Sequence, residues 1–588
     1  MVKDEFSYLC GLLDIFVTIT VLGLAVITAE AGTYSGGTGE PNDPYLISTA
    51  ADMNAIGADS NDWDKHFLLI NDINLADYTG EEFNLIGTGI PFTGVFDGNG
   101  HTISNFTYKE TFHLPWPILH PTLDHTDQRF NTLTNINNMF GDDFIQDKTI
   151  VIPTPNDINW IPIPIPFPPS FGGDGLFANV DGADAEIKNL TLVDPNIKTC
   201  GGYIGALVGH LQNGTLNNCA VEGSTVCDIG GIIIVDPPQS RLGGLVGYIS
   251  DGNVSNCYVL NAQFKGGAAG GLTARNEAGT ISNCYAINPV VTEGSLISGG
   301  LVTVNFGVIS NSYVTGSGND CGLVGTNLGV ISNCHAAGTA RWAGLVGFNE
   351  GAISNCYATG VVAGNNFAGG LVSGNKGEIS NCYATAAVDG NNLIGGLVGY
   401  NDGTISNCYA AGPVAGDVNV GALVGYDDGG SYVSCFWDSD INPDVNGIGN
   451  TTDPNVVGKT TFEMMIESTF ADAGWDFNTP VWTIEEGVDY PRLWWEMLVE
   501  PVDLLIELSE SIDSMSLQKG IANSLQVKLN TALRLLEDEN EHNDVAAINS
   551  LQAFINAVNA QHGKKISEEY ADYLVTAAQQ IIDLLNSE

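Results

Sequence analysis

Short apolar runs separated by glycine and asparagine recur through the middle of the chain, and they define the elements that the sequence predicts. Residues 343–357, for example, read Ala-Gly-Leu-Val-Gly-Phe-Asn-Glu-Gly-Ala-Ile-Ser-Asn-Cys-Tyr. Runs this short, rich in Val, Ile, Tyr and Cys, are typical of strands joined by tight turns. The 3.6-residue apolar period of a helix is missing. The middle of the chain is therefore predicted to be β structure.

Two short motifs of this pattern, Gly-Leu-Val-Gly and Ile-Ser-Asn-Cys-Tyr, recur in nine copies between residues 202 and 437. In one copy Ser312 takes the cysteine position of the second motif. The other eight copies have a cysteine there: Cys219, Cys257, Cys284, Cys334, Cys356, Cys382, Cys408 and Cys435. The steps between the nine positions are 38, 27, 28, 22, 22, 26, 26 and 27 residues. Because helical repeats are usually longer, this period favours one coil of a solenoid per copy. The predicted fold is mainly β, a right-handed parallel β-helix (solenoid).

One copy also predicts which side chains point inward. Strict alternation from Ile353 would turn Cys356 outward, so we expect a corner near Asn355 that restores the phase. Cys356 and Ala358 should then face the core and Tyr357 should face outward. Stacked coils should align their asparagines into a ladder of amides, each bonded to the next.

The turns and the outward tyrosines give two further expectations. Gly351, Gly377 and Gly403 each follow Asn-x, which favours tight turns with positive φ. Five outward tyrosines should form an exposed aromatic stripe: Tyr258, Tyr285, Tyr357, Tyr383 and Tyr409. Such a stripe suits stacking on sugars, but stacked tyrosines also stabilise a solenoid by themselves.

The chain has 12 cysteines, and their placement argues against a disulfide framework. Eight recur at one coil position and should form a column of parallel side chains, which is poor disulfide geometry. Cysteine is also a good small core residue, so we predict buried free thiols. A Cys200–Cys227 bridge stays open. Without a Cys-x-x-Cys pair, a thiolate zinc site has little support.

The repeated words Gly-Leu-Val-Gly and Ile-Ser-Asn-Cys-Tyr resemble the GLUG motif. The resemblance covers roughly residues 202–437, and nine copies in register make it specific. That motif occurs in bacterial surface and secreted proteins, including adhesin-like proteins and an immunoglobulin-cleaving protease, where it lies outside the catalytic part. The resemblance implies a β-helix and a surface location, but no defined chemistry.

Capping segments are expected on both sides, because open ends would expose core and strand edges. Residues 32–109 should form an N-terminal cap and the first coils, with a short helix capped by Ser48. A Pro-rich insertion should span 110–173, the GLUG-repeat solenoid 174–437 and an aromatic-rich C-terminal cap 438–498. Several possible metal ligands lie in the insertion, but their spacing matches no signature and favours unrelated surface residues: His113, His120, Asp124 and His125.

The start of the C-terminal cap resembles a calcium loop. Counted from Asn442, oxygen-bearing residues occupy positions 1, 3, 5 and 12, with glycine at 6: Asn442, Asp444, Asn446 and Asp453. The segment departs from the pattern in its first residue, in Pro443 and in ending with Asp rather than Glu. Calcium is the one cofactor that the sequence suggests, and an ordinary polar turn is the alternative.

Residues 499–588 change to a helical pattern. Apolar residues at helical spacing predict four helices near 502–514, 517–537, 544–561 and 567–586, a small C-terminal α-helical bundle. This part resembles the FIMAH-type helical domain found at the ends of some bacterial secreted proteins. The resemblance does not settle its role.

Net charge limits the partners. With 19 Lys plus Arg against 68 Asp plus Glu, the formal charge is −49. A polyanion releases no counterions from DNA or RNA, and anionic membrane surfaces repel it, so we expect neither nucleic acid nor membrane as a partner. An extracellular glycan or a cell-envelope component is the expected partner.

The first residues predict export. Residues 9–28 are mostly apolar and Ala29-Glu30-Ala31 fits a cleavage site, so residues 1–31 are predicted to be a signal peptide. The mature chain would then be secreted or lie on the cell surface, with no membrane segment after cleavage. An uncleaved anchor is the alternative, because about 20 apolar residues can span a bilayer.

The sequence therefore predicts a non-enzymatic repeat protein for adhesion or extracellular binding, without catalytic residues. The alternative is a β-helix enzyme that degrades polysaccharides, either a lyase or a glycoside hydrolase. Such enzymes need paired carboxylates, or a base beside acidic calcium ligands, on one face. The basic residues of the repeats look scattered instead: Arg241, Lys265, Arg275, Arg341 and Lys376.

Overall fold

The computed structural model describes residues 34–109, 173–199, 202–228, 241–266, 268–293, 298–364, 366–479, 481–497, 501–515, 517–536 and 544–585. The predicted signal peptide, Cys200 and nearly all of the Pro-rich insertion with its histidines lie outside these residues. Within the described ranges, no helix is both long and apolar enough to cross a membrane.

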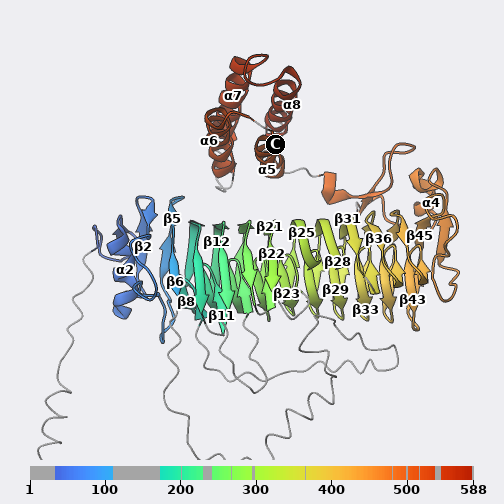
Figure 1. Ribbon diagram of the computed structural model, residues 1–588, viewed down its shortest axis with the longest axis horizontal. Helices are drawn as coiled ribbons and strands as arrows, with labels where there is room; N and C mark the ends of the chain where they lie inside the picture. Colours follow the sequence, from blue (N-terminus) through green and yellow to red (C-terminus); the bar gives the residue numbers. More distant parts are fainter. Residues whose placement is uncertain are drawn as a thin grey trace, which may run out of the picture. The chain divides into compact units, whose positions relative to one another are not determined.

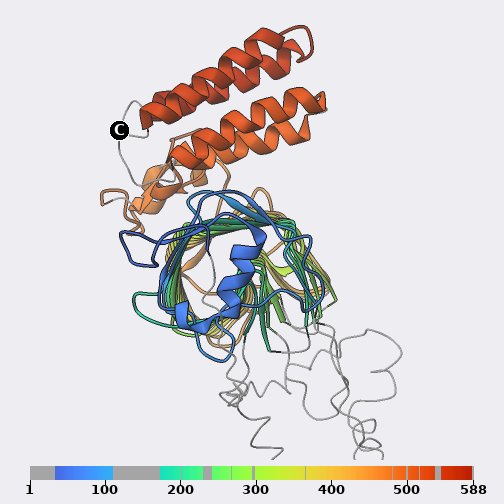
Figure 2. The same cartoon turned by 90° about the vertical axis from the view of Figure 1, so that its left-hand side faces the viewer.

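The first described elements close one end of a stack of parallel strands. β1 (Tyr45–Ile47) pairs with β2 (His66–Leu69), and β2 pairs with β4 (Val95–Asp97). Helix α2 (Ala50–Ala58) lies across this end of the stack (Figure 2) and buries Met53 and Ile56 against it. Its N-cap is Thr49 in a capping box with Asp52, one residue after the predicted Ser48.

Parallel pairing then continues coil by coil to β46 (Figure 1). Successive coils add their strands to three columns of paired strands that run along the solenoid, and we call these columns the first, second and third lines. The first line contains β8 (Phe177–Val180), the start of β12 (Val208–Glu222), the start of β15 (Val246–Ser255), β19 (Thr273–Asn276), β23 (Val302–Asn305), β26 (Val324–Asn327), β29 (Val346–Asn349), β33 (Val372–Asn375), β38 (Val398–Asn401) and β43 (Val424–Asp427). The second contains β4, the start of β9 (Glu186–Val193), parts of β12 and β15, β20 (Thr280–Ser282), β24 (Val308–Ser310), β27 (Val330–Ser332), β30 (Ala352–Ser354), β34 (Glu378–Ser380), β39 (Thr404–Ser406) and β44 (Ser431–Val433).

The third line contains β5 (Thr102–Ser104), the ends of β9 and β12, β16 (Tyr258–Leu260), β21 (Tyr285–Ile287), β25 (Tyr313–Cys321), β28 (His335–Ala343), β31 (Tyr357–Ala363), β35 (Tyr383–Ala384), β40 (Tyr409–Ala410), β45 (Cys435–Asp438) and β46 (Val456–Lys459). Shorter strands complete the coils: β3 (Ile73–Asn74), β6 (Thr107–Lys109), β7 (Gly173–Asp174), β10 (Asn196–Thr199), β11 (Tyr203–Gly205), β13 (Thr225–Asp228), β14 (Arg241–Gly243), β17 (Gln263–Lys265), β18 (Ala268–Gly270), β22 (Val290–Glu293), β32 (Asn366–Gly369), β36 (Ala387–Asp389), β37 (Asn392–Gly395), β41 (Val414–Ala415) and β42 (Val418–Gly421). The predicted parallel β-solenoid is confirmed.

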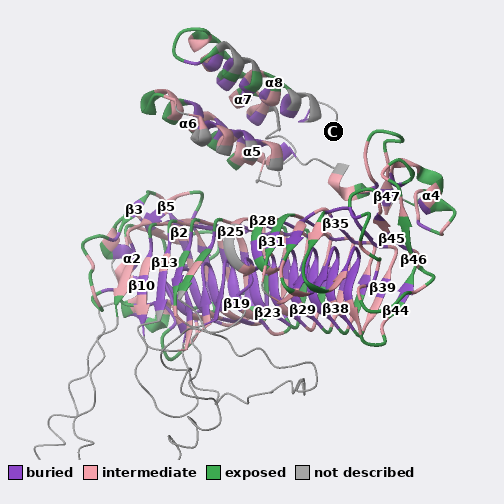
Figure 3. Cartoon of the chain, turned by 45° about the vertical axis from the view of Figure 1, so that its right-hand side comes forward, coloured by how far each residue is buried: buried purple, intermediate pink, exposed green. Residues whose placement is uncertain are grey.

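The core fills the inside of the coils (Figure 3). Ile353, Cys356 and Ala358 are at most 1 % exposed, as predicted. Asn355 has φ 52°, the left-handed conformation that asparagine adopts more easily than most residues. This corner between the second and third lines recurs in coil after coil: Asn218, Asn256, Asn283, Asn311, Asn333, Asn381, Asn407 and Ser434. The predicted shift in the alternation of inward and outward side chains is therefore produced by a corner that recurs from coil to coil.

The expectation that the turn glycines adopt positive φ was wrong. Gly351, Gly377 and Gly403 are absent from the positive-φ residues. They are glycine because the coils approach closely: a Cβ on Gly377 would lie 2.0 Å from the carbonyl oxygen of Gly351, and one on Gly403 2.3 Å from that of Gly377. Backbone contact between coils, not turn conformation, excludes a side chain there.

Residues 438–497, the C-terminal cap, follow the last coil. They contain β46, a one-turn 3-10 helix at Glu463–Met465, α4 (Glu467–Ala471), the antiparallel pair β47 (Trp482–Thr483) and β48 (Arg492–Leu493), and a 3-10 turn at Trp494–Met497. Buried Met464, Phe470, Trp475, Trp482 and Leu493 form its core together with Tyr383, Tyr409 and Phe436 of the coils. The cap is therefore built onto the side of the solenoid.

Four helices end the chain: α5 (Pro501–Ser514), α6 (Lys519–Leu536), α7 (Asp544–Gln561) and α8 (Glu568–Leu585). Each packs against the next and α5 packs against α8, around a core that includes Leu525, Leu551, Phe554 and Leu574. Ser567 Oγ accepts the N–H of Tyr570 at the start of α8. The bounds match the predicted helices to within three residues.

Candidate functional site

The predicted column of cysteines lies inside the solenoid and carries no disulfide. All eight thiols are free and 0 % exposed. The N–H of Cys356 points to Sγ of Cys382 at 3.4 Å, and the Cys356 thiol donates to the carbonyl oxygen of Ser354 at 3.1 Å. Burial raises the pKa of Cys356 and Cys382, so these thiols are poor nucleophiles. Ser312 continues the column and accepts the N–H of Cys284.

A second buried column consists of asparagine amides, which belong to the last residues of first-line strands. Each Nδ2 donates to Oδ1 of the next coil at 2.8–2.9 Å, through Asn276, Asn305, Asn327, Asn349, Asn375 and Asn401. Asn401 then donates to the hydroxyl of Tyr432, which donates to Asp427 at 2.6 Å. At the other end, Ile249 takes the asparagine position and Oδ1 of Asn276 has no hydrogen-bond partner among the described residues. We call this the inner ladder.

A third column runs in the opposite sense on the outside. The corner asparagines donate Nδ2 to Oδ1 of the preceding coil at 3.0–3.3 Å, for example Asn355 to Asn333 and Asn381 to Asn355. We call this the corner ladder. The predicted amide ladder is thus confirmed, and the coils contain two of them with opposed directions.

Beside the corner ladder lies a stack of aromatic rings, which we call the ring column: Tyr258, Tyr285, Tyr313, His335, Tyr357, Tyr383 and Tyr409. Neighbouring centroids are 4.8–5.1 Å apart and neighbouring planes lie within 9° of each other. Burial lowers the pKa of His335 to about 4, so its ring is neutral at pH 7. The rings therefore stack largely on each other, which is the structural role that the sequence left open.

The C-terminal cap covers one half of the ring column, contrary to the expected exposure of the whole stripe. Tyr383 and Tyr409 are 0 % exposed. Trp482 packs against both rings, and Trp495 packs against His335 and Tyr357. The cap residues that contact these rings lie 61 or more residues after Tyr409, so no local pattern could have predicted the contact.

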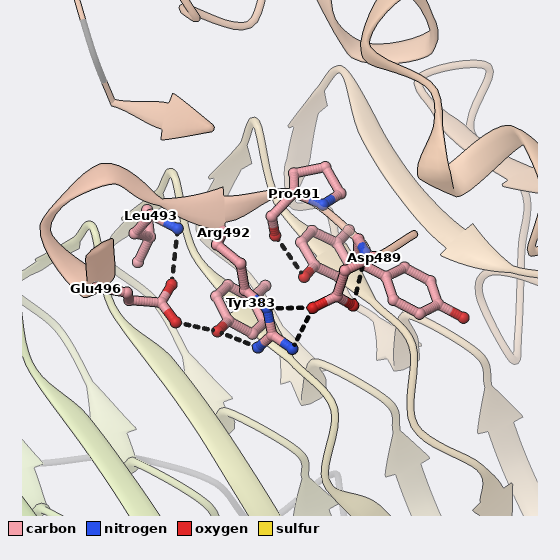
Figure 4. Close-up of polar contacts among 8 residues, drawn as sticks. Tyr383, Asp489, Pro491, Arg492, Leu493 and Glu496 are labelled. Carbon is pink, nitrogen blue, oxygen red and sulfur yellow. Dashed lines mark hydrogen bonds and ion pairs between the residues drawn. The ribbon is translucent and has the colours of Figure 1, made fainter. Parts of the chain in front are cut away.

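Polar contacts fix the cap in place (Figure 4). The hydroxyl of Tyr383 donates to Glu496 and accepts from Arg492, and the hydroxyl of Tyr409 donates to the carbonyl oxygen of Pro491. Arg492 also pairs with Asp489 at 2.9 Å. Burial raises the pKa of Glu496, although its hydrogen bonds and Arg492 act against this rise.

The N-terminal half of the ring column differs from the covered half. Tyr258, Tyr285 and Tyr313 keep part of their surface exposed. The hydroxyl of Tyr258 donates to Oε1 of Glu222 at 3.2 Å, and burial raises the pKa of this carboxyl. Asparagines line both sides, with the corner ladder before the rings and Asn261 and Asn288 after them.

The structure describes all four predicted calcium ligands, and their surroundings differ. The amide of Asn442 is 4 % exposed, accepts the N–H of Val414 and donates to the carbonyl oxygen of Gly412. Asp444 and Asn446 are exposed on the turn, and Asp453 accepts the N–H of Asn455. Calcium binding at this loop stays a prediction.

The buried carboxylate of this segment is Asp438, which sequence reasoning did not single out. It is 0 % exposed and accepts hydrogen bonds from Thr461 and Tyr490 within the cap. Among the residues that the structure describes, no three His, Cys, Asp or Glu side chains gather as a metal site.

Comparison with known proteins adds two families. Residues 239–262 and 390–415 match the GLUG motif, and residues 502–583 match the FIMAH domain. An 88-residue stretch is 40% identical to "Halomucin" of Haloquadratum walsbyi, covering 14% of this chain and 1% of that protein. A 111-residue stretch is 30% identical to a "Putative Gly-rich membrane protein" of Evansella cellulosilytica, covering 18% of this chain and 13% of that one.

The chain thus spans only a small part of the length of these curated relatives. A crystal structure of "a putative immunoglobulin A1 protease" from Bacteroides ovatus is 16% identical, with a TM-score of 0.27 over 79% of this chain and 95% of that one. A score this low supports no argument about function. The motif and domain matches agree with the repeated coils and the four terminal helices, and the chain contains GLUG motifs and a C-terminal FIMAH domain.

Proposed function

We propose that this chain is a non-catalytic repeat protein of the cell surface or extracellular space, and that it binds a glycan along the N-terminal half of the ring column. The observation that carries the proposal is the contact that the chain makes with the other half. Trp495 lies against His335 and Tyr357, and its Nε1 donates to the carbonyl oxygen of Asn355 at 3.0 Å. The column thus accepts a flat ring with a polar edge.

A pyranose ring has a similar shape, with apolar faces and a rim of hydroxyls, and aromatic side chains with polar tips suit such a ligand. The coil repeat places equivalent corners, Asn283 and Asn311, just before Tyr285 and Tyr313. The groups that hold Trp495 in the C-terminal half therefore recur in the N-terminal half.

The polar groups around these rings favour a hydroxylated ligand over a charged one. A side-chain amide has two N–H groups, and the corner ladder uses one of them. Tyrosine hydroxyls and the carboxyl of Glu222 add further donors and acceptors. The surface location is supported by the GLUG match and by the printed names of the two relatives.

Binding to an array of neutral and charged polysaccharides tests the proposal. We expect Tyr285→Ala and Tyr313→Ala each to weaken binding about three- to tenfold, from the stacking energy of one ring. Tyr400→Ala is the matched control, because Tyr400 stacks on Tyr426 in the first line. Equal losses in all three variants, or no glycan bound by the unaltered chain, would contradict the proposal.

The same samples distinguish binding from catalysis. Each polysaccharide that binds is assayed for released reducing ends and for unsaturated products, with Glu222→Gln in parallel. Product formation that this single substitution abolishes would overturn the non-catalytic part of the proposal and favour the enzyme alternative.

A further inference from the structure

Trp495 marks the edge of the C-terminal cap on the ring column. Its ring centroid lies 5.6 Å from that of Tyr357 and 6.0 Å from that of His335. Its plane is tilted by 26° against the first ring and by 31° against the second. The indole thus lies beside two consecutive rings at once. The next ring of the column toward the N-terminal half is Tyr313, which stacks on His335.

Polar contacts and burial fix Trp495 at this edge. Its Nε1 donates to the carbonyl oxygen of Asn355 at 3.0 Å. The chain is also anchored on both sides of the indole. Before it, Leu493 is 0 % exposed and donates its N–H to Oε1 of Glu496 at 2.7 Å. After it, Oε2 of Glu496 accepts the hydroxyl of Tyr383 at 2.7 Å. Because the flanking residues are held, the indole keeps its place and excludes other groups from it.

The ring column itself continues unchanged beneath Trp495. The centroids of Tyr285 and Tyr313 are 4.9 Å apart, those of Tyr313 and His335 are also 4.9 Å apart, and those of His335 and Tyr357 are 4.8 Å apart. Because burial lowers the pKa of His335 to about 4, this position carries no charge at pH 7 that would set it apart. The stack of rings therefore does not end at Tyr313, and only its covering changes there.

We propose that Trp495 determines the length of the glycan that the ring column binds. It occupies the place beside His335 and Tyr357 that further sugar units would need, and so it ends the site after Tyr313. The inference rests on the proposed function, because it presupposes a glycan along the N-terminal half. Trp495 acts by excluding volume, since close-packed side chains leave no room for a second ring in the same place. Its removal should therefore favour long glycans and leave short ones unaffected.

Calorimetry on the full chain with oligosaccharides of graded length tests the proposal. The probes are cello-oligosaccharides and chito-oligosaccharides, from the disaccharide to the octasaccharide, together with size fractions of any polysaccharide that binds on the array. In the unaltered chain, affinity should rise with probe length and level off once the exposed rings are covered. In Trp495→Ala the shortest probes should bind as before. The longest should bind about three- to tenfold more tightly, from the stacking energy of one further ring.

Three further variants separate control of length from a general loosening of the cap. Trp494→Ala removes the same kind of side chain from the neighbouring position, which is 43 % exposed, and should leave the length dependence unchanged. Trp495→Phe keeps a ring at the edge and should keep the shorter limit. Tyr357→Ala, combined with Trp495→Ala, should abolish the gain for long probes. This combination decides the question even if alanine loosens the cap, because a gain without Tyr357 does not come from this position.

The outcomes distinguish this inference from the proposed function. A gain in Trp495→Ala that is confined to long probes and needs Tyr357 supports the inference. A gain of equal size at every length, or one that Trp494→Ala shares, overturns it, while glycan binding at the ring column stands. An unchanged length dependence in Trp495→Ala overturns it in the same way. If neither the unaltered chain nor Trp495→Ala binds any probe, both the inference and the proposed function are contradicted.

Discussion

The hydroxyl of Tyr383 donates a 2.7 Å hydrogen bond to Glu496, although 113 residues separate them in the chain. This contact joins the ring column to the C-terminal cap, and Arg492 donates to the same hydroxyl. The cap is therefore held by a small, partly buried polar network as well as by its tryptophans.

The raised pKa of Glu496 predicts that the cap loosens as pH rises. Because the folded-state pKa of Glu496 lies above the ordinary glutamate value of 4.5, the stabilisation is complete below about pH 4.5 and is lost as pH rises through the folded-state value. Tryptophan fluorescence during thermal unfolding, from pH 4.5 to 7, reports the cap. Glu496→Gln should flatten the pH dependence, and an unchanged slope in that variant would count against this role.

The inner ladder predicts a large loss of stability when one amide is removed. Asn349→Leu leaves the Nδ2 group of Asn327 and the Oδ1 of Asn375 without their ladder partners in a buried site. Each such group costs about 1–3 kcal/mol, so unfolding in urea should show a loss of about 2–6 kcal/mol. Glu350→Gln on the neighbouring exposed position should stay within about 0.5 kcal/mol. Equal midpoints for the two variants would show that the ladder is energetically unimportant.

Sequence pattern was enough to predict the coils because it recurs with the period of the structure. The inward Cys356, the corner at Asn355 and the bounds of α5 to α8 follow from local rules. The inner ladder also had a signal, since Asn327, Asn349, Asn375 and Asn401 each lie four residues after the leucine of a Gly-Leu-Val segment of the repeat.

Contacts between distant segments could not be predicted in this way. Nothing near Trp495 indicates that it packs against Tyr357, because such a contact depends on where the chain folds back. The register of Tyr248 with Arg275 was hidden for a related reason, because coils of unequal length obscure which positions lie side by side. Periodicity predicts what lies inside a coil better than what lies beside it.

The corner conformation predicts a difference between two substitutions of one residue. Asn333 has φ 53°, where an alanine pays the left-handed penalty of about 1–2 kcal/mol and a glycine does not. Both variants lose the same amide bond to Asn311. Chemical denaturation should therefore find Asn333→Ala about 1 kcal/mol less stable than Asn333→Gly. The reverse order would contradict a strained corner.

The buried thiol column predicts protection from alkylation. In the native chain at pH 8, Cys356, Cys382 and Cys408 should stay unmodified by iodoacetamide, since they are 0 % exposed and burial raises the pKa of Cys356 and Cys382. After unfolding, peptide mass spectrometry should find all three alkylated. A mass loss of about 2 Da between two column cysteines would reveal a disulfide and refute the free column.

The uniform direction of the inner ladder has an evolutionary consequence. Every coil from Asn305 to Asn375 receives a proton donor from one side and offers one to the other. If a coil within this stretch is duplicated or deleted, every amide of the ladder still finds a partner in the neighbouring coil. Ile249 and the Tyr432–Asp427 pair, by contrast, fix the two ends of the ladder. Gene duplication can therefore lengthen or shorten this protein in whole coils, and natural length variants should differ between these two ends.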